Sequence, residues 1–315
     1  MFEILPKKIK SKNYFITGGL GQDATILKNI LKKNKKKFFL ITKKSQIIKK
    51  NNRLNYIYID LEKKKEIINL FKKIRPDVVL HLAANNPSFS ESSKKKFFTE
   101  NLKITKNLFN SVFEINQNAK FVFCSSSQIF KKKVGLVNEK SIKHKSTDYT
   151  KFRIEADDYM IKYKNKHNIK YTNAILFNHD SIYRNKKFII PRLINAIIEK
   201  KYSFIKTILT KNIYADFSHA EDVCLGIYKL LISKINLDSV IFSSNKLTSL
   251  NSIILKLLKK EKIEISKLEY NITKPHKNIF GSHQIARKHL KWNSKKNIHN
   301  AASEILEYYK KNFKN

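Results

Sequence analysis

Short, almost wholly apolar runs alternate with longer segments of helical spacing through the first 178 residues of the chain. Apolar residues three or four positions apart lie on one face of a helix, whereas a short run that is apolar at every position is typical of a strand buried on both faces. This alternation predicts a parallel sheet covered by helices on both sides, a doubly wound Rossmann-type α/β fold. Strands are expected at residues 14–17, 38–42, 56–59, 78–83, 121–123 and 171–177, and helices at 24–31, 63–74, 97–115 and 149–163.

Beyond residue 178 the alternation becomes irregular. We predict a second, smaller and mixed lobe formed mainly by residues 179–315, and a segment near 221–245 that returns to the domain formed by residues 1–178. Helical spacing recurs at residues 188–199, 221–231, 252–259 and 301–309.

The composition is that of a folded protein, because 42% of the 315 residues are hydrophobic. No run of about 20 apolar residues occurs that could span a membrane, and the first twelve residues hold no apolar block of the kind that a secretion signal needs. The two cysteines, Cys124 and Cys224, are too few for a disulfide framework. We expect a cytoplasmic protein without a membrane partner, and we predict no metal site.

The net charge of +40, from 65 basic and 25 acidic residues, raises the question of a nucleic-acid partner. Only six of the basic residues are arginines, whose planar side chains suit phosphate and base recognition better than those of lysine. The lysines are spread along the whole chain in short runs. We therefore predict no nucleic-acid partner and keep a nucleic-acid binder as an alternative that charge alone supports. We also expect the positive field to attract anionic substrates.

Three of the chain's six glycines, Gly18, Gly19 and Gly21, fall within four positions between the first expected strand and the first expected helix. Small residues there let the backbone turn tightly and approach a pyrophosphate, to which the start of the helix presents its N–H groups. The spacing therefore predicts a dinucleotide-binding loop, with an ordinary strand-to-helix turn as the alternative. On this prediction residues 1–178 bind the cofactor and residues 179–315 mainly bind the substrate.

The residues after the second expected strand, Lys43, Lys44 and Ser45, indicate which dinucleotide binds. An acidic residue at this point would accept hydrogen bonds from the ribose hydroxyls of NAD, whereas lysines and a serine suit the 2′-phosphate of NADP. We therefore predict NADP rather than NAD as the cofactor. Later strand ends supply further candidate contacts, which are Asp60 and Leu61 beside the adenine and Leu82, Ala83 and Ala84 where the cofactor passes close.

A hydroxyl-rich strand end and a tyrosine on the next helix make up the candidate catalytic residues. The strand at 121–123 runs into a serine-rich stretch that contains Ser126, and Tyr149 and Arg153 follow on the expected helix. Residues four apart lie on the same face of a helix, so the phenol and the cation are one turn apart. A nearby cation lowers the pKa of a phenol and lets it exchange a proton with a substrate hydroxyl beside a nicotinamide.

Together and in this order, these motifs resemble the extended short-chain dehydrogenase/reductases, a family of NAD-dependent sugar-nucleotide epimerases and dehydratases. Within that family the chain is most similar to the GDP-mannose 4,6-dehydratases, through segments at 17–23, 43–45, 176–184, 216–222 and 286–292. The resemblance implies that Tyr149 removes the proton of the sugar C4 hydroxyl while NADP takes the hydride, with Ser126 in the position of the family's threonine. It implies a nucleotide diphosphate sugar as partner, with GDP-mannose as the candidate, and we expect a homo-oligomer. The remaining cofactor contacts that it implies are Gly18, Gly21, Gln22 and Asp23 at the pyrophosphate, with His179 and Arg184 nearby.

Three residues depart from the pattern of this family. Gln128 stands in place of the carboxylate that takes the C5 proton in the dehydratases, Arg153 in place of a lysine, and Ala215 in place of an arginine that clamps the substrate diphosphate. An amide cannot accept a proton at ordinary pH, so we expect hydride exchange at C4 to be easier than dehydration. The alternatives to a dehydratase are therefore a 4-epimerase or 4-ketoreductase and a catalytically impaired homologue.

Other residues are predicted to compensate for these departures. Glu139 and Asp148, in the segment before Tyr149, are the nearest carboxylates in the sequence that could replace the missing base. Arg192 is expected to neutralise the substrate diphosphate, and Asn178 to bind the sugar-proximal part of the substrate. A diphosphate without a charge partner would bind poorly in a partly desolvated cleft.

Overall fold

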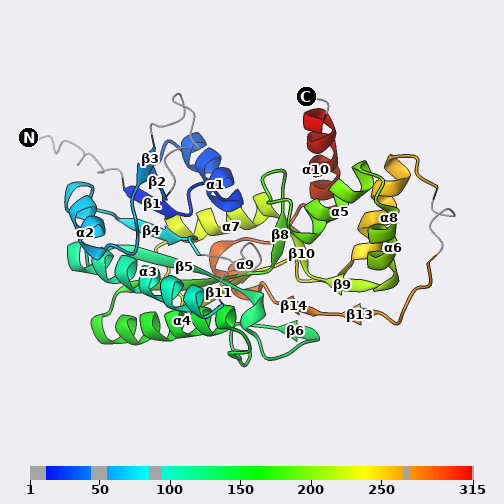
Figure 1. Cartoon of the computed structure of the whole chain (residues 1–315). Coiled ribbons are helices and arrows are strands. Elements are labelled where there is room, and N and C mark those ends of the chain that lie inside the picture. The colour runs from blue at the N-terminus through cyan, green and yellow to red at the C-terminus, as the bar shows by residue number, and fades with distance from the viewer. Residues whose placement is uncertain (1–11, 44–54, 85–93, 265–269, 314–315) are drawn as a thin grey trace, which may run out of the picture.

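The computed structural model describes residues 12–43, 55–84, 94–264 and 270–313. Figure 1 shows two lobes side by side, a larger one built on a central sheet and a smaller one made mostly of helices. Among the described residues, no helix is long and apolar enough to cross a membrane, and no group of three or more His, Cys, Asp or Glu side chains could hold a metal ion.

Seven parallel strands form the central sheet, in the order β11-β7-β5-β4-β1-β2-β3. The chain runs from β1 to one edge through β2 and β3 and then builds the other half of the sheet from β4 outward. This reversal confirms the predicted doubly wound fold, and it opens a crevice at the carboxyl ends of β1 and β4, where such sheets bind their ligands. The strands are β1 (Asn13–Thr17), β2 (Lys37–Thr42), β3 (Tyr56–Tyr58), β4 (Val78–His81), β5 (Lys120–Ser126), β7 (Lys170–Leu176) and β11 (Ser239–Phe242).

Helices cover both faces of this sheet (Figure 1). Two of them, α1 and α7, lie together over one face, where Leu27 and Ile227 are fully buried, and three others cover the opposite face, where Phe109 and Phe121 are fully buried. Because the strands are covered on both sides, most of them have apolar residues at consecutive positions and not only at alternate ones. The helices are α1 (Gln22–Lys33) and α7 (Ala220–Ile232) on the first face, and α2 (Lys64–Lys73), α3 (Lys94–Ile115) and α4 (Asp148–His167) on the second.

Strand β4 is shorter than the run at 78–83 predicts, and the reason is a side chain on the neighbouring strand. The backbone N–H groups of Leu82 and Ala83 donate to the hydroxyl oxygen of Thr17, at 3.1 and 3.0 Å. They therefore leave the ladder after His81, and the chain turns past the end of β1. This places the small residues after β4 directly beside the glycine loop.

Strand β5 is longer at both ends than its apolar run at 121–123 predicts. At its start the buried ammonium of Lys120 donates to the carbonyl oxygens of Leu230 and Ile235, at 2.6 and 3.2 Å, so a lysine is accommodated inside the sheet. Burial lowers the pKa of Lys120 to about 8. At its other end β5 stays paired with β7 through Ser126, which carries the serine-rich stretch to the crevice.

The smaller lobe has a core of its own, formed between four helices. Ile194, Ile254 and Ile305 come from three of these helices and are fully buried in it. Helix α6 was not expected from the sequence. It is only nine residues long and follows Lys200, whose positive φ of 56° ends the preceding helix abruptly. The four helices are α5 (Ile189–Ile198), α6 (Tyr202–Thr210), α8 (Leu250–Lys260) and α10 (Ile298–Phe313).

Two elements from the later part of the chain return to the larger lobe. α7 packs on α1, and β11 pairs with β7 at the edge of the large sheet. The division of the chain at residue 178 stays a prediction. The remaining elements, none of them expected from the sequence, are η3 (Ser127–Ile129), β6 (Gly135–Val137), β8 (Asn178–Asp180), β9 (Ile213–Ala215), β10 (Phe217–His219), β12 (Thr248–Ser249), β13 (His276–Lys277), β14 (Ile279–Gly281) and α9 (Gln284–Leu290).

Candidate functional site

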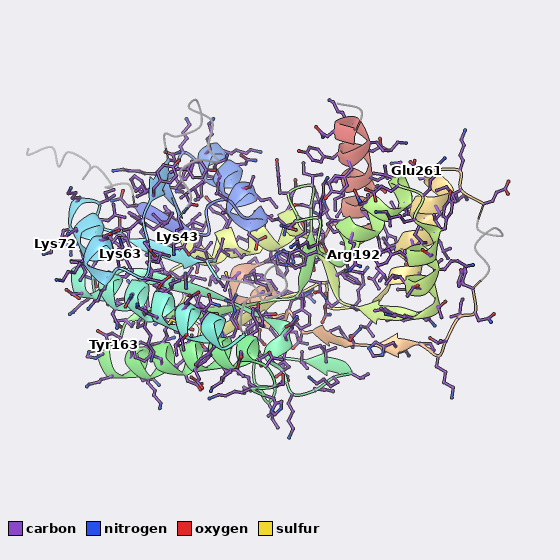
Figure 2. The ribbon with its side chains drawn as sticks, in the orientation of Figure 1. Lys43, Lys63, Lys72, Tyr163, Arg192 and Glu261 are labelled. Carbon is purple, nitrogen blue, oxygen red and sulfur yellow. The ribbon has the colours of Figure 1, made fainter. Side chains whose placement is uncertain are left out.

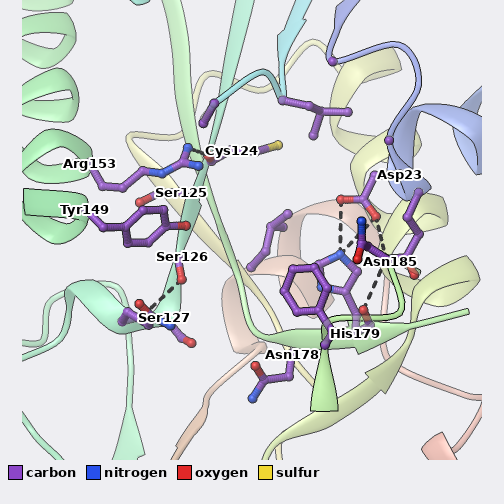
Figure 3. A pocket seen from close by; sticks show the side chains of 18 of the residues that line it. Asp23, Cys124, Ser125, Ser126, Ser127, Tyr149, Arg153, Asn178, His179 and Asn185 are labelled. Atoms are coloured by element: carbon purple, nitrogen blue, oxygen red, sulfur yellow. Dashed lines mark hydrogen bonds and ion pairs between the residues drawn. The ribbon is translucent and has the colours of Figure 1, made fainter. Parts of the chain in front are cut away.

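A cavity of about 730 Å³ lies at the carboxyl ends of the central strands. The glycine loop, the end of β5, the start of α4, strand β8 and the segment after it all contribute to its lining. Figure 3 shows Tyr149, Arg153 and the serines on one side of this cavity and Asp23, His179 and Asn178 on the other. Residues separated by more than 150 positions in the chain therefore face one space.

The glycine loop has the geometry of an anion-binding turn. Gly18 adopts a φ of +70°, which favours glycine, and an added Cβ would come within 3.2 Å of the backbone nitrogen of Ala83. The N–H of Gly21 donates to the carbonyl of Gly18 at 2.9 Å, and α1 begins at the next residue. Gly21 provides no side-chain cap, so the first turn of α1 leaves backbone N–H groups for a ligand. The tight turn directly before the start of α1 is the geometry that the spacing predicts, and pyrophosphate binding there stays a prediction.

The first turn of α1 is linked to strand β8 by a buried ion pair between Asp23 and His179. The Nε2 atom of His179 lies 3.0 and 3.2 Å from the two carboxylate oxygens of Asp23, and its Nδ1 donates to the carbonyl of Phe177 at 2.6 Å. Both ring nitrogens face acceptors, so the imidazole is held as the cation.

The pKa values of this pair are shifted in opposite directions. Burial alone would raise the pKa of Asp23, but the charge and hydrogen bond of His179, helped by Arg184, lower it to about 2. Burial alone would lower the pKa of His179, but Asp23 raises it above the ordinary 6.5. Gln22 strengthens the link because its amide donates to the carbonyl of His179 at 3.2 Å and accepts from the hydroxyl of Ser181 at 3.0 Å. The predicted residues Gln22, Asp23 and His179 thus lie together at the cavity.

A second polar network supports the loop at the ends of β1 and β4, and no motif in the sequence indicated it. His81 is fully buried between Thr17 and Thr105, whose hydroxyl oxygens lie 2.8 Å from Nδ1 and 2.9 Å from Nε2. Since the Thr17 oxygen already accepts two backbone N–H groups, its own O–H donates to Nδ1, and Nε2 carries the proton. Burial, and then the charge of Arg153, lower the pKa of His81 to about 3, so this ring is neutral.

The candidate catalytic residues are brought together as the sequence predicts. The guanidinium of Arg153 donates to the carbonyl of Cys124, and its carbon lies 5.2 Å from the centre of the Tyr149 ring (Figure 3). Arg153 is only 7% exposed, and its Nε has no hydrogen-bond partner among the described residues. The hydroxyl oxygen of Ser126 accepts from the backbone N–H of Gln128 at 3.3 Å and caps η3. Phenol, cation and hydroxyl therefore line one wall.

Hydrogen bonds at the start of α4 hold the backbone that carries Tyr149. Thr147 and Thr150 form a reciprocal capping box, in which each hydroxyl accepts from the other residue's backbone N–H, at 3.2 and 2.9 Å. Asp148 and Tyr149, which lie between them, both line the cavity.

The residues predicted for the adenosine end of the cofactor lie at the ends of β2 and β3. The Lys43 ammonium lies 3.4 Å from carboxylate oxygens of both Asp60 and Glu62, and Leu61 between them is partly buried. Lys44 and Ser45 lie outside the described residues. Of the small residues after β4, Leu82 and Ala84 line the cavity, and Ala83 contacts Gly18 as described above.

The predicted residues at positions 178, 184 and 192 separate into two groups. Asn178 and Arg184 line the cavity; the Asn178 amide donates to the carbonyl of Asp216 at 3.3 Å, and the Arg184 side chain pairs with Asp180 at 3.3 Å. Arg192 does not line it. Its guanidinium stacks at 4.5 Å over the ring of Phe204 on α6, and Figure 2 shows it on the smaller lobe.

Of the two carboxylates predicted to replace the missing base, Asp148 and Glu139, only one lines the cavity. Asp148 lines the cavity, whereas Glu139 does not and accepts instead from the backbone N–H of Ile241 at 2.9 Å. Burial raises the pKa of Glu139. Gln128 lines the cavity with an exposed side chain. Other lining residues that the sequence did not single out are Phe98, Asn101, Ser125, Tyr183, Asn185 and Phe188.

Comparison with known proteins shows which family the sequence belongs to. The sequence model of the NAD dependent epimerase/dehydratase family matches residues 14–239. GDP-mannose 4,6 dehydratase 1 from Arabidopsis thaliana is 24% identical over 251 residues, which cover 72% of this chain and 68% of that protein. GDP-mannose 4,6 dehydratase 2 from the same plant is 24% identical over 249 residues, 72% of this chain and 65% of that protein, which is less than two thirds of its length.

Solved structures of this family share the fold. UDP-glucose 4-epimerase from Thermotoga maritima, solved with UDP-glucose, superposes with a TM-score of 0.81 at 16% identity, covering 96% of this chain and 99% of its own. dTDP-glucose 4,6-dehydratase from Bacillus anthracis, in complex with NAD, gives 0.80 at 16% identity over 96% and 98%. RMD from Pseudomonas aeruginosa, complexed with NADPH, gives 0.75 at 18% identity over 96% and 100%. The family match covers well over half of the sequence, and the chain therefore belongs to the NAD dependent epimerase/dehydratase family.

Proposed function

We propose that the protein is an NADP-dependent enzyme that acts at carbon 4 of a nucleotide sugar, with Tyr149 as the group that exchanges the hydroxyl proton. The observation that carries the proposal is the wall formed by Tyr149, Arg153 and Ser126, which faces a glycine loop suited to a pyrophosphate across one cavity. When bound, the nicotinamide supplies the hydride acceptor and donor.

The residues on this wall divide the work. The guanidinium of Arg153 lies against the ring of Tyr149, so its positive charge stands beside the phenol that is proposed to take the C4 hydroxyl proton. The O–H of Ser126 points from the end of β5 and is suited to hydrogen-bond the same substrate oxygen, because its oxygen already accepts from the backbone. The helix start and the glycine loop hold the cofactor's phosphates.

The relatives and one residue, Gln128, support the choice of candidate substrate and reaction. GDP-mannose is the first candidate substrate, since the curated relatives carry its name, and 4,6-dehydration is the first candidate reaction. Gln128 favours the second candidate, a 4-epimerase or 4-ketoreductase, because its amide cannot take a carbon-bound proton. Asn178 is proposed to contact the substrate. Contact with Arg192 would require the substrate to extend beyond the cavity lining. A homo-oligomer and a cytoplasmic location stay predictions.

The test is incubation of the protein with NADP or NAD and a panel that includes GDP-mannose, UDP-glucose and dTDP-glucose. Mass spectrometry reports loss of water, and chromatography reports epimers. We expect Tyr149→Phe to lower turnover by about 10² to 10⁴, the usual effect of a general acid–base group. Tyr163→Phe is the matched control, because Tyr163 lies on the same helix, does not line the cavity and should leave turnover unchanged.

Two results would contradict the proposal. One is the absence of both product and cofactor reduction with every sugar of the panel. The other is an unchanged turnover of Tyr149→Phe.

A further inference from the structure

The cavity contains two carboxylates among its described lining residues, Asp23 and Asp148. Dehydration needs a base that removes a proton from the sugar carbon next to C4, and residue 128 is a glutamine. Which of the two carboxylates is available therefore decides whether the site can perform this step. The inference below rests on the proposed function.

Asp23 is already committed to other groups. It holds the His179 cation through both carboxylate oxygens and accepts a hydrogen bond from Gln22 at 3.1 Å. Its pKa of about 2 means that it holds no proton in the pH range in which enzymes work. Protonating it would also leave a charged imidazole buried without its partner. Asp23 is therefore a structural carboxylate and a poor proton acceptor.

Glu139, the other carboxylate predicted from the sequence as a replacement base, lies outside the cavity lining. Its Oε1 holds the backbone N–H of Ile241 in β11 at 2.9 Å. Moving it toward the substrate would leave that N–H without its partner.

Asp148 meets the requirements that the other two fail. It is the first residue of α4, directly before Tyr149, is partly exposed and lines the cavity. An acidic residue in the first turn of a helix often serves the cap, but here Thr147 and Thr150 form the cap between them. Within the described part of the chain, no hydrogen bond or ion pair engages the Asp148 carboxylate. Its oxygens are therefore available to a ligand in the cavity.

We propose that Asp148 is the catalytic base that takes the C5 proton of the sugar after C4 has been oxidised. The C5–H bond breaks, its proton forms an O–H bond on the Asp148 carboxylate, and its electron pair moves into the C4 carbonyl to give an enolate. When the enolate collapses, the C6–O bond breaks, and the Asp148 carboxylic acid gives its proton to the departing oxygen. Water leaves, the carboxylate is restored, and no further reactant is needed for this step.

The experiment follows the two steps separately in the same reaction. GDP-mannose labelled with deuterium at C4 reports hydride transfer, through deuterium that appears in the nicotinamide or, once the hydride has returned to the dehydrated sugar, at C6. Unlabelled GDP-mannose in D₂O reports removal of the C5 proton, through deuterium that appears at C5. We expect Asp148→Asn to keep hydride transfer within about threefold and to lower C5 exchange and water loss by about 10² to 10⁴.

Three further variants make the result specific. Glu139→Gln is the matched control, because Gln can still accept from Ile241, and it should leave both signals unchanged. Asp148→Glu should keep part of the C5 exchange, since it keeps the carboxylate. Gln128→Glu placed in the Asp148→Asn background should restore exchange, because it returns a carboxylate to the same cavity.

The outcomes distinguish this inference from the proposed function. Hydride transfer at C4 without C5 exchange in the unmodified protein, or C5 exchange that survives in Asp148→Asn, overturns the role of Asp148 and leaves the proposed function standing. Absence of hydride transfer in the unmodified protein overturns both. A purely structural role of Asp148 would lower thermal stability and both signals together, which also overturns the inference.

Discussion

The buried pair of Asp23 and His179 gives the protein a pH-dependent part of its stability. The pKa of His179 is raised, so its contribution is fully present below the ordinary 6.5 and is lost as pH rises through the folded value. The pKa of Asp23 is lowered to about 2, so its contribution is present above the ordinary 3.8 and is lost as pH falls toward 2. The pair therefore stabilises the fold most between pH values of about 4 and 6.5.

Asp23→Asn tests this window. Breaking a buried ion pair by removing one partner typically costs about 3–5 kcal/mol, because the other charge stays buried and uncompensated. We expect a loss of this order in the free energy of unfolding at pH 5.5 and a smaller loss at a pH above the raised pKa of His179, where the imidazole is neutral. Urea unfolding at the two pH values measures it. An equal loss at both would mean that the pair is not ionised in the folded protein.

At the scale of residues, the sequence predicts contacts between residues that are close in the chain and misses contacts between residues that are far apart in it. Tyr149 and Arg153 are four positions apart on one helix, so their proximity follows from helix geometry alone. In the structure the two side chains are in contact. Asp23 and His179 are 156 positions apart, and the Thr17 and His81 pair is 64 apart, so only the folded chain brings them together. The family resemblance named Asp23 and His179 separately, but nothing in the spacing indicated that they bind each other.

At the scale of elements, close packing decides which residues a helix tolerates. Gly226 lies in α7 where the helix meets the aromatic rings of Phe242 and Trp292. A Cβ added at Gly226 would lie 2.5 Å from Phe242 Cε1 and 3.0 Å from Trp292 Cε2, both shorter than a normal contact. Both rings are buried, so neither can move away freely.

Gly226→Ala should therefore destabilise the protein, although alanine is the better helix former by about 1 kcal/mol. Overpacking of a core typically costs about 1–3 kcal/mol, and here it should exceed the gain in helix propensity. Leu225→Ala is the control, because Leu225 is the exposed neighbour on α7 and its loss should change stability by no more than about 0.5 kcal/mol. Urea unfolding of both variants provides the measurement, and a Gly226→Ala protein as stable as the original would refute the packing argument.

Element boundaries were predictable where burial alone sets them. The buried runs of β1, β2 and β7 were found within one residue because each is mainly apolar and both faces are covered. β7 also contains two buried polar residues, Thr172 and Asn173. The ends of β4 and β5 were not, because side chains set them: the Thr17 hydroxyl ends β4, and the buried Lys120 extends β5. The two- and three-residue strands of the smaller lobe are too short to leave a period in the sequence.

At the scale of the whole molecule, the net charge of +40 acts on the choice of cofactor. NADP carries a 2′-phosphate that NAD lacks, so a general positive field already favours NADP without any dedicated site. Among the described residues, Lys43 is the one predicted to recognise that phosphate, and its ammonium pairs with Asp60 and Glu62 at 3.4 Å each. A specific site and a general field must be separated by variants that change the net charge equally.

Glu62→Gln and Glu114→Gln form such a pair, because each removes one negative charge. Glu62 contacts Lys43, whereas Glu114 pairs with Lys64 at the far end of α3. We expect the unmodified protein to bind NADPH at least tenfold tighter than NADH, about 1.4 kcal/mol, and Lys43→Ala to erase most of this preference. Glu62→Gln should leave Lys43 with Asp60 as its remaining charge partner and so widen the preference, and Glu114→Gln should leave the preference unchanged. Calorimetric titration of both cofactors at one fixed ionic strength measures the ratio. If Glu62→Gln and Glu114→Gln change it equally, the field and not Lys43 selects the cofactor.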